Sequence, residues 1–205
     1  MSHEPQKLDS VFYDRNDVLK IARELLGKIL VTRLDGIRSS GRIVETEAYA
    51  GVNDRASHAF GGRRTARSED LYGPPGSVYI YICYGMHHLF NVITNKKEIP
   101  HGVLIRALEP LEGVDQMLIR TGKPFADFTL TKGPGNLSRA LGISKLQSGT
   151  NLFSDEIFIE DDRLRYKKDQ IGITWRIGVE SAREDAELPY RFIVKGNPYV
   201  SARKS

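Results

Sequence analysis

The sequence predicts an α+β fold, a single compact domain on a curved antiparallel β-sheet with a protruding β-hairpin and surrounding helices. Several segments have the alternating or continuous apolar pattern of strands, and the connections between them are too short for parallel crossovers. The 205 residues are 40% hydrophobic, which suffices for the core of one domain. No linker, repeat or low-complexity stretch divides the chain.

The N-terminal part of the chain predicts a disordered start followed by one helix. Residues 1–10 are polar and show no periodic pattern, so we expect them to be disordered. Asn16 and Asp17 are candidate N-caps, because their side chains can accept a hydrogen bond from the first helical turn. Gly27 is expected to end the helix. Its predicted apolar face consists of Val18, Ile21, Leu25 and Leu26.

The rest of the chain predicts strands around one long loop. Residues 28–34 and 42–50 flank the turn sequence Asp35–Gly36, which is typical of a β-hairpin. Residues 51–76 contain too many turn-forming residues for a helix and are interpreted as an ordered functional loop or a flexible lid. Residues 133–143 predict a short helix that a proline opens and a glycine closes. Further strands are expected within 77–84, 89–94, 102–108, 171–179 and 189–196, with Gly85 and Gly102 in short connections.

The charge balance is weakly basic and leaves two interpretations open. Thirty Lys and Arg against 26 Asp and Glu give a formal charge of +4, a modest attraction to polyanions. Basic residues gather within 55–67 and near the C-terminus and acidic ones within 155–162, so either two oppositely charged sides or scattered solvated charge is expected. No segment resembles a signal peptide or approaches the ~20 apolar residues of a membrane span, which predicts a soluble intracellular protein. Neither a metal nor another cofactor is expected, because no familiar ligand spacing is formed by Cys83, His87, His88 and His101.

Two carboxylates in the second predicted strand are candidates for acid–base chemistry. Glu45, Glu47 and Tyr49 share one face of the strand, because side chains alternate along it. Paired carboxylates beside an aromatic ring fit a catalytic site. The alternative is the solvent-facing side of an edge strand, and the strand pattern alone leaves both possibilities open.

Other polar and aromatic residues stand out in apolar strands. Tyr81 and Tyr84 are an odd number of positions apart, so their side chains point to opposite faces of the strand. One ring can then lie in a cleft while the other projects from a turn. The alternative is ordinary strand packing, because tyrosine is common in strands. Asn91 and Arg106 interrupt apolar strands, where an amide or guanidinium is costly to bury without a partner; exposure on an edge strand is the alternative. His58, in the long loop, fits either a site or a structural role.

Taken together, five segments resemble the alkyladenine (3-methyladenine) DNA glycosylase family of the mammalian type. They are GRIVETEAYAG, ASHAFGGRRT, PGSVYIYICYGMHHLFNV, VLIRALEPLEG and GPGNLSRALGI, and the resemblance spans roughly residues 11–202. The chain looks like a bacterial member of the family. The resemblance implies that residues 1–205 form a single catalytic domain that hydrolyses the N-glycosidic bond of an alkylated or deaminated purine in DNA.

The resemblance also implies a role for individual residues. Glu47, rather than Glu45, matches the general base, and Arg106 matches the residue beside the catalytic water and the adjacent phosphate. The pocket for the extruded base is implied to contain Tyr49, His58, Tyr81 and Asn91, with Asn91 disfavouring guanine. The implied DNA contacts are Tyr84, which fills the gap in the duplex, Met86, Arg63, Arg64 and Thr65. The Val179 carbonyl matches a position that holds the water.

The implied partner is double-stranded DNA with damaged purines: 3-methyladenine, with 7-methylguanine, hypoxanthine and ethenoadenine as further candidates. A monomer is expected, cytoplasmic and nucleoid-associated in a bacterium. No lysine lies in the matched site motifs, so a Schiff-base lyase step is not expected. His87 and His88 depart from the more aromatic mammalian motif. A protein that binds distorted DNA without chemistry and a metal-dependent hydrolase are the rival interpretations.

Overall fold

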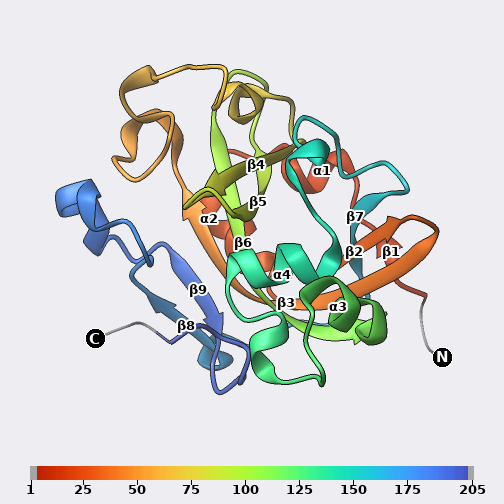
Figure 1. Cartoon of the computed structure of the whole chain (residues 1–205). Helices are drawn as coiled ribbons and strands as arrows, with labels where there is room; N and C mark the ends of the chain where they lie inside the picture. The colour runs from red at the N-terminus through yellow and green to blue at the C-terminus, as the bar shows by residue number, and fades with distance from the viewer. Residues whose placement is uncertain (1–3, 203–205) are drawn as a thin grey trace.

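An antiparallel sheet of nine strands dominates the computed structural model, which describes residues 4–202 (Figure 1). The main path through the sheet runs β1-β7-β2-β3-β6-β5-β4, and β9 pairs with both β3 and β8. The predicted α+β fold is therefore confirmed. The strands are β1 (Gln6–Lys7), β2 (Ile29–Leu34), β3 (Ile37–Tyr49), β4 (Val78–Cys83), β5 (His87–Thr94), β6 (His101–Glu112), β7 (Ile157–Asp161), β8 (Ile171–Thr174) and β9 (Arg191–Val194).

Short helices cover the sheet. Helices α3 and α4 pack side by side, with α4 on β5 and β6 and α3 next to β3, while α2 packs on β3 and β6 (Figure 1). The main core lies between these helices and the sheet, and Ile21 of α2 and Leu137 of α4 are both fully buried in it. The α-helices are α1 (Ser10–Tyr13), α2 (Val18–Glu24), α3 (Val114–Thr121) and α4 (Pro134–Leu141). The 3-10 helices are η1 (Gly51–Asn53), η2 (Phe60–Gly62), η3 (Glu69–Tyr72), η4 (Phe128–Leu130), η5 (Lys145–Gln147), η6 (Lys168–Gln170) and η7 (Glu180–Glu187).

Strand β3 is the longest strand and lies inside the sheet, not at its edge. It pairs with β2 at one end and with β6 along most of its length. At Glu45–Glu47 it also pairs with β9 on its other side. Its register with β6 shifts at three places, which bend the strand. The edge-strand alternative for the two glutamates is therefore excluded, because neighbours flank them on both sides.

Both predicted hairpins form. Asp35 and Gly36 have φ angles of 54° and 74° between β2 and β3. Tyr84 and Gly85, with φ angles of 50° and 72°, connect β4 and β5 in the same left-handed conformation. Gly102 corrects the prediction, because it lies inside β6 opposite Ile93 and not in a connection.

The N-terminal half has the predicted helix but is more ordered at its start than predicted. Asp17 caps α2, since its side chain accepts a hydrogen bond from Lys20 N, and the helix was predicted correctly, although it ends at Glu24, before Gly27. The prediction that residues 1–10 are disordered is wrong for the described residues 4–10. Gln6–Lys7 pair with β7, and Lys7 forms an ion pair of 2.9 Å with Asp155. Residues 1–3 lie outside the described residues.

The C-terminal half also differs from the prediction. Strand β7 was missed because its short apolar run leads into an acidic stretch that resembles a loop. Helix α3 was missed as well, whereas the predicted helix at α4 is confirmed and ends at Gly142 in the left-handed conformation. Only Ile171–Thr174 of residues 171–179 form a strand, because Arg176 turns inward to Asp54.

The long loop of residues 51–76 is ordered by three 3-10 helices, η1, η2 and η3. It bonds back onto itself, since Asp54 accepts hydrogen bonds from Ala50 N and Ala56 N, and onto a distant segment, since Arg55 N donates one to Asp185. Of its two interpretations, the ordered loop describes the structure. Among the residues described, no helix is long and apolar enough to cross a membrane.

Candidate active site

Glu47 is fully buried in β3 and is held by three groups. Its Oε1 accepts a hydrogen bond of 2.7 Å from the backbone N–H of Ile177. Its Oε2 accepts one of 2.9 Å from the Tyr49 hydroxyl and lies 3.2 Å from Nη1 of Arg106. Oε1 has a single partner, and each carboxylate oxygen can accept more than one hydrogen bond. The carboxylate is therefore fixed in place while keeping capacity to bind a further donor.

Glu45 has a different environment, although Arg106 contacts both glutamates. Its Oε1 lies 2.9 Å from Nε of Arg106 and 2.7 Å from Nε of Arg191. Its Oε2 accepts a hydrogen bond of 2.7 Å from Ser201 N. Glu45 is thus the shared counterion of two buried arginines, a structural arrangement.

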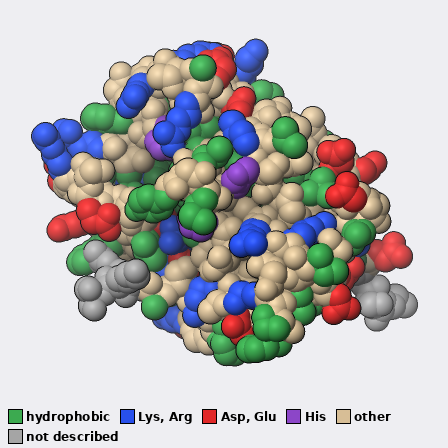
Figure 2. Space-filling view, viewed as in Figure 1, with side chains coloured by type: hydrophobic (Ala, Val, Ile, Leu, Met, Phe, Trp, Pro, Cys, Tyr) green, Lys and Arg blue, Asp and Glu red, His purple; other side chains and the backbone are tan. Residues whose placement is uncertain are grey.

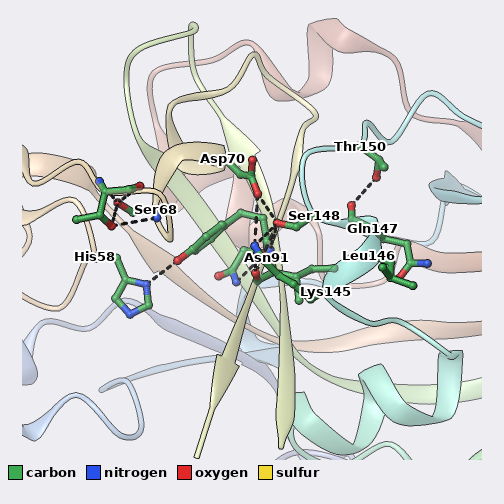
Figure 3. Close-up of polar contacts among 12 residues, drawn as sticks. His58, Ser68, Asp70, Asn91, Lys145, Leu146, Gln147, Ser148 and Thr150 are labelled. Atoms are coloured by element: carbon green, nitrogen blue, oxygen red, sulfur yellow. Dashed lines mark hydrogen bonds and ion pairs between the residues drawn. The ribbon is translucent and has the colours of Figure 1, made fainter. Parts of the chain in front are cut away.

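A cavity of about 420 Å³ opens beside Glu47, and its lining includes all three partners of that carboxylate. The volume falls in the range of about 300–1,000 Å³ that is usual for small-molecule sites. One wall is aromatic, with the rings of His58 and Tyr81 meeting edge-on at 4.6 Å. Nδ1 of His58 and the Tyr79 hydroxyl are 2.8 Å apart in a hydrogen bond (Figure 3). The structure therefore brings Tyr49, His58, Tyr81, Asn91, Arg106 and Val179 around one cavity.

Burial controls the charge of the cavity wall. It raises the pKa of Tyr79 to about 12 and raises the pKa of Tyr81 and of Tyr49 above the ordinary range, with Glu47 adding to the effect at both. Burial, helped by the positive charges of Arg67 and Arg63, lowers the pKa of His58. The tyrosines and the histidine are therefore neutral near pH 7.

Arg106 places a positive charge directly against Glu47. Burial alone would lower its pKa, but Glu47 and Glu45 outweigh this effect and hold the pKa above the usual range. The guanidinium is therefore permanently charged where it contacts Glu47 Oε2.

Asn91 is held rigidly at the cavity. Its side-chain amide donates hydrogen bonds to Tyr79 O at 3.2 Å and Leu89 O at 3.0 Å, and the residue is only 5% exposed. Both acceptors are backbone carbonyls, which fixes the orientation of the amide. The side chain cannot leave this position without breaking both bonds.

The β4–β5 hairpin projects two exposed apolar side chains beside the cavity. Tyr84 is 91% exposed and Met86 is 70% exposed, and Tyr84 also borders the cavity. A tyrosine with a positive φ angle is uncommon, and here the turn directs the ring away from the domain. A cavity beside an ordered carboxylate, with an aromatic side chain raised at its rim, is an arrangement suited to extracting a base from DNA.

Comparison with known proteins agrees with this geometry. Residues 11–198 match the family described as Methylpurine-DNA glycosylase (MPG). The chain belongs to this family. It is therefore a DNA glycosylase that acts on damaged DNA, and both the family and the enzyme class predicted from the sequence are confirmed.

Bacterial relatives resemble this glycosylase along nearly their whole length. A Clostridium perfringens (strain 13) protein is 45% identical over 96% of this chain and 100% of its own. A protein from Clostridium acetobutylicum is 45% identical over 97% of this chain and 98% of its own. A protein from Bacillus cereus (strain G9842) is 46% identical over 94% of this chain and 97% of its own. Each is named "Putative 3-methyladenine DNA glycosylase".

Positive charge on the glycosylase gathers on the face that carries the hairpin. Figure 2 shows Lys, Arg and His side chains near the middle of this face, with Asp and Glu mainly toward its margin. The acidic residues around β7 are largely paired: Glu160 with Arg38 at 2.8 Å and Asp162 with Arg42 at 2.7 Å. Arg203 and Lys204, part of the predicted C-terminal basic cluster, lie outside the described residues.

The three predicted phosphate contacts lie together in the loop beside the cavity but differ in their freedom. Arg63 is exposed. Arg64 is paired with Glu69 at 2.7 Å and with Glu98 at 2.5 Å, so a phosphate has to compete with two carboxylates there. Thr65 bonds to Ser68 through both its N–H and its hydroxyl.

The structure also adds site groups that the sequence did not reveal. Arg176 forms a fully buried double ion pair with Asp54, at 2.5 and 2.9 Å, and its guanidinium lies 4.9 Å from the centre of the Tyr49 ring. The Ile177 N–H that binds Glu47 follows directly in the chain. Neither had a sequence signal, because the segment resembles an ordinary strand. The Val179 carbonyl accepts a hydrogen bond of 2.9 Å from Ala182 N at the cavity wall.

Proposed function

We propose that this DNA glycosylase is monofunctional and releases alkylated purines, 3-methyladenine first, from double-stranded DNA in base-excision repair. The observation that carries the proposal is the Glu47 carboxylate, held by Tyr49, Arg106 and Ile177 against the aromatic cavity. The relatives' printed name supports 3-methyladenine as substrate. 7-methylguanine, hypoxanthine and ethenoadenine are further candidate bases. The proposed enzyme is a monomer of one catalytic domain, cytoplasmic and nucleoid-associated in a bacterium.

Glu47 acts as the general base. It takes a proton from a water molecule, the water oxygen forms a bond to C1′ of the flipped nucleotide, and the N-glycosidic bond breaks with its electron pair going to the departing base. The Val179 carbonyl is proposed to orient the water from the cavity wall. Arg106, charged and 3.2 Å from Glu47 Oε2, orients the carboxylate, and it is proposed to contact the neighbouring phosphate as well.

Recognition depends on an aromatic wall without its own charge. Tyr81, His58 and Tyr49 surround the base, and a purine made cationic by alkylation gains about 0.5–2 kcal/mol from aromatic faces. The neutral state of His58 avoids repulsion of that cation. Asn91, locked by two hydrogen bonds, blocks the exocyclic amino group of guanine.

The surface around the cavity holds the duplex. Tyr84 enters the space that the flipped nucleotide leaves, and Met86 contacts the bases beside it. Arg63, Arg64 and Thr65 contact phosphates, with Arg64 exchanging its carboxylate partners for DNA. No lysine lines the cavity among the described residues, which supports simple hydrolysis without a Schiff-base intermediate.

The test is product analysis with purified protein in EDTA. Oligonucleotide duplexes containing 3-methyladenine or hypoxanthine should yield the free base and an alkali-labile abasic strand. Binding without base release would favour a protein that only recognises distorted DNA. Loss of activity in EDTA with cleaved phosphodiester products would favour the metal-dependent hydrolase.

A further inference from the structure

An exposed leucine beside the DNA-facing hairpin has no role in the chemistry above. Leu146, in the middle of η5, is 87% exposed. Among the large hydrophobic side chains of residues 4–202, only Tyr84 is more exposed. A single exposed apolar residue is ordinary on a protein surface, so its support and surroundings decide whether it has a function.

Leu146 is carried by a rigid support. Ser144 and Gln147 form a reciprocal capping box around η5, with Ser144 N donating to Gln147 Oε1 at 2.8 Å. Ser148, which follows η5, accepts a hydrogen bond of 3.0 Å from Ile80 N and donates one of 2.5 Å to Asp70 (Figure 3). The leucine is therefore held at a fixed place and is not on a loose loop.

The support of Leu146 is the same strand that leads to the β4–β5 hairpin. Lys145 Nζ donates a hydrogen bond of 2.9 Å to Ile80 O, so η5 lies along the outer edge of β4. Strand β4 carries Tyr79 and Tyr81 of the base cavity and continues into Tyr84. The Ile80 residue that η5 bonds is four residues, about 13 Å along the strand, from the hairpin tip at Tyr84.

A groove connects the hairpin to η5. Its volume is about 440 Å³, and it is lined by Met86 and His88 from the hairpin, Arg139 from α4 and Ser144 at the start of η5. Arg139 is exposed, whereas Lys145, with a side chain 43% exposed, is paired with Asp70 at 3.5 Å. Leu146 follows two positions after Ser144, where the groove ends, and the exposed Arg139 lines the same groove. An apolar side chain beside a groove that carries an exposed cation and begins at an exposed aromatic hairpin has the chemistry of a minor-groove contact.

We propose that Leu146 is a second apolar contact to duplex DNA, entering the minor groove near the base step that Tyr84 opens. The inference rests on the proposed function, because it takes the hairpin as the DNA-contacting element. Tyr84 and Leu146 then contact the DNA at the two ends of the protein groove. These two contacts hold the duplex bent, with a widened minor groove, in the form in which the lesion is extruded. Leu146 is a positioning residue: it contacts DNA and not the reacting atoms.

The test compares Leu146→Ser with a matched control, Val11→Ser. Val11 is 72% exposed and borders a different groove, formed with Gln6, Lys7 and Asp161 at the opposite edge of the sheet. Affinity is measured by fluorescence anisotropy with a hypoxanthine-containing duplex, and excision by single-turnover kinetics on duplex and on single strands. Both residues are exposed, so both variants should fold with the parent's melting temperature.

We expect Leu146→Ser to bind the lesion duplex about tenfold more weakly, the loss of one stacking or groove contact. Leu146→Ser should excise the base from single strands at the parent's rate. Leu146→Met keeps an apolar side chain of similar volume, so it should bind the lesion duplex within about twofold of the parent. Val11→Ser should match the parent in both measurements. Equal duplex affinity for Leu146→Ser and Val11→Ser would overturn the inference. Loss of self-association in sedimentation, with unchanged DNA affinity, would also overturn it and assign Leu146 to a protein interface. If the parent released no base, the proposed function would fail, whereas a weaker duplex affinity of Leu146→Ser would still support the contact.

Discussion

Two glutamates that are two positions apart in β3 have different roles because their partners differ. Glu45 shares its carboxylate between Arg106 and Arg191, whereas Glu47 meets Tyr49, the Ile177 N–H and one nitrogen of Arg106. The sequence could place both on one strand face, but only the family resemblance selected Glu47. The Ile177–Glu47 and Arg191–Glu45 contacts join residues 130 and 146 positions apart, which no local pattern can reveal.

Glu45→Gln should lower stability rather than chemistry. Removing its charge leaves two buried arginines with too little compensation, and breaking a buried ion pair typically costs about 3–5 kcal/mol. Urea unfolding should show this loss, while the single-turnover rate of the folded fraction should stay near the parent's. A variant with parental stability would contradict the structural role.

The lowered pKa of His58 predicts a base-dependent pH profile. Above its ordinary value of about 6.5, His58 is neutral in both folded and unfolded protein. As the pH falls through the lowered pKa of the folded state, the ring gains a proton and repels a cationic base. Single-turnover excision of 3-methyladenine should therefore fall relative to that of hypoxanthine on the acid side of pH 6.5.

The control for this effect is His58→Gln, in which the ring cannot become charged. Changes at other titrating groups that affect both bases equally cancel in the ratio of the two rates. The acid-side fall of the ratio should disappear in the variant. A ratio with the same acid-side fall in parent and variant would show that His58 is not its cause.

At the level of elements, the turns were the most predictable features. Asp35–Gly36 and Gly85 identified both hairpins because these residues tolerate positive φ angles. Strand β7 was not predicted because its apolar run is short and is followed by acidic residues, which in the fold form ion pairs with Arg38 and Arg42. Strand β1 depends on β7 as a partner, so its two residues carry no signal of their own.

The β4–β5 hairpin should matter for duplex DNA and not for the chemical step. Tyr84→Ala removes an exposed ring, and stacking contacts of this kind contribute about 1–3 kcal/mol per base. Affinity for lesion duplex should therefore fall about 5- to 150-fold. Excision from single strands should change little, since no partner base has to be replaced there. Equal losses on both substrates would contradict the insertion of Tyr84 into the duplex.

Across the whole molecule, the site is assembled from segments far apart in the sequence. Asp54 of the long loop and Arg176 after β8 meet in a pair that is 1% and 0% exposed. The pair lies behind the Tyr49 ring, and Asp54 orders the loop that carries His58. Arg176 directly precedes Ile177, whose N–H binds Glu47. The sequence predicted an ordered loop or a lid. It did not predict the ion pair that fixes the loop, because Asp54 and Arg176 are 122 positions apart.

Arg176→Met should therefore affect both stability and the cavity. It leaves Asp54 buried and unpaired, at a typical cost of about 3–5 kcal/mol. Thermal unfolding should report the loss, and excision should weaken at temperatures where the protein is still folded. The double variant Arg176→Met with Asp54→Leu should recover part of the stability but not the activity. Parental stability in the single variant would contradict this account.

The most direct test of the central claim, that Glu47 activates water, is single-turnover excision of hypoxanthine from duplex DNA by Glu47→Gln. General-base catalysis contributes about 10²–10⁴-fold, so the rate should fall by that factor while affinity for the lesion duplex stays near the parent's. A Glu47→Gln variant that releases the base as fast as the parent would contradict the claim.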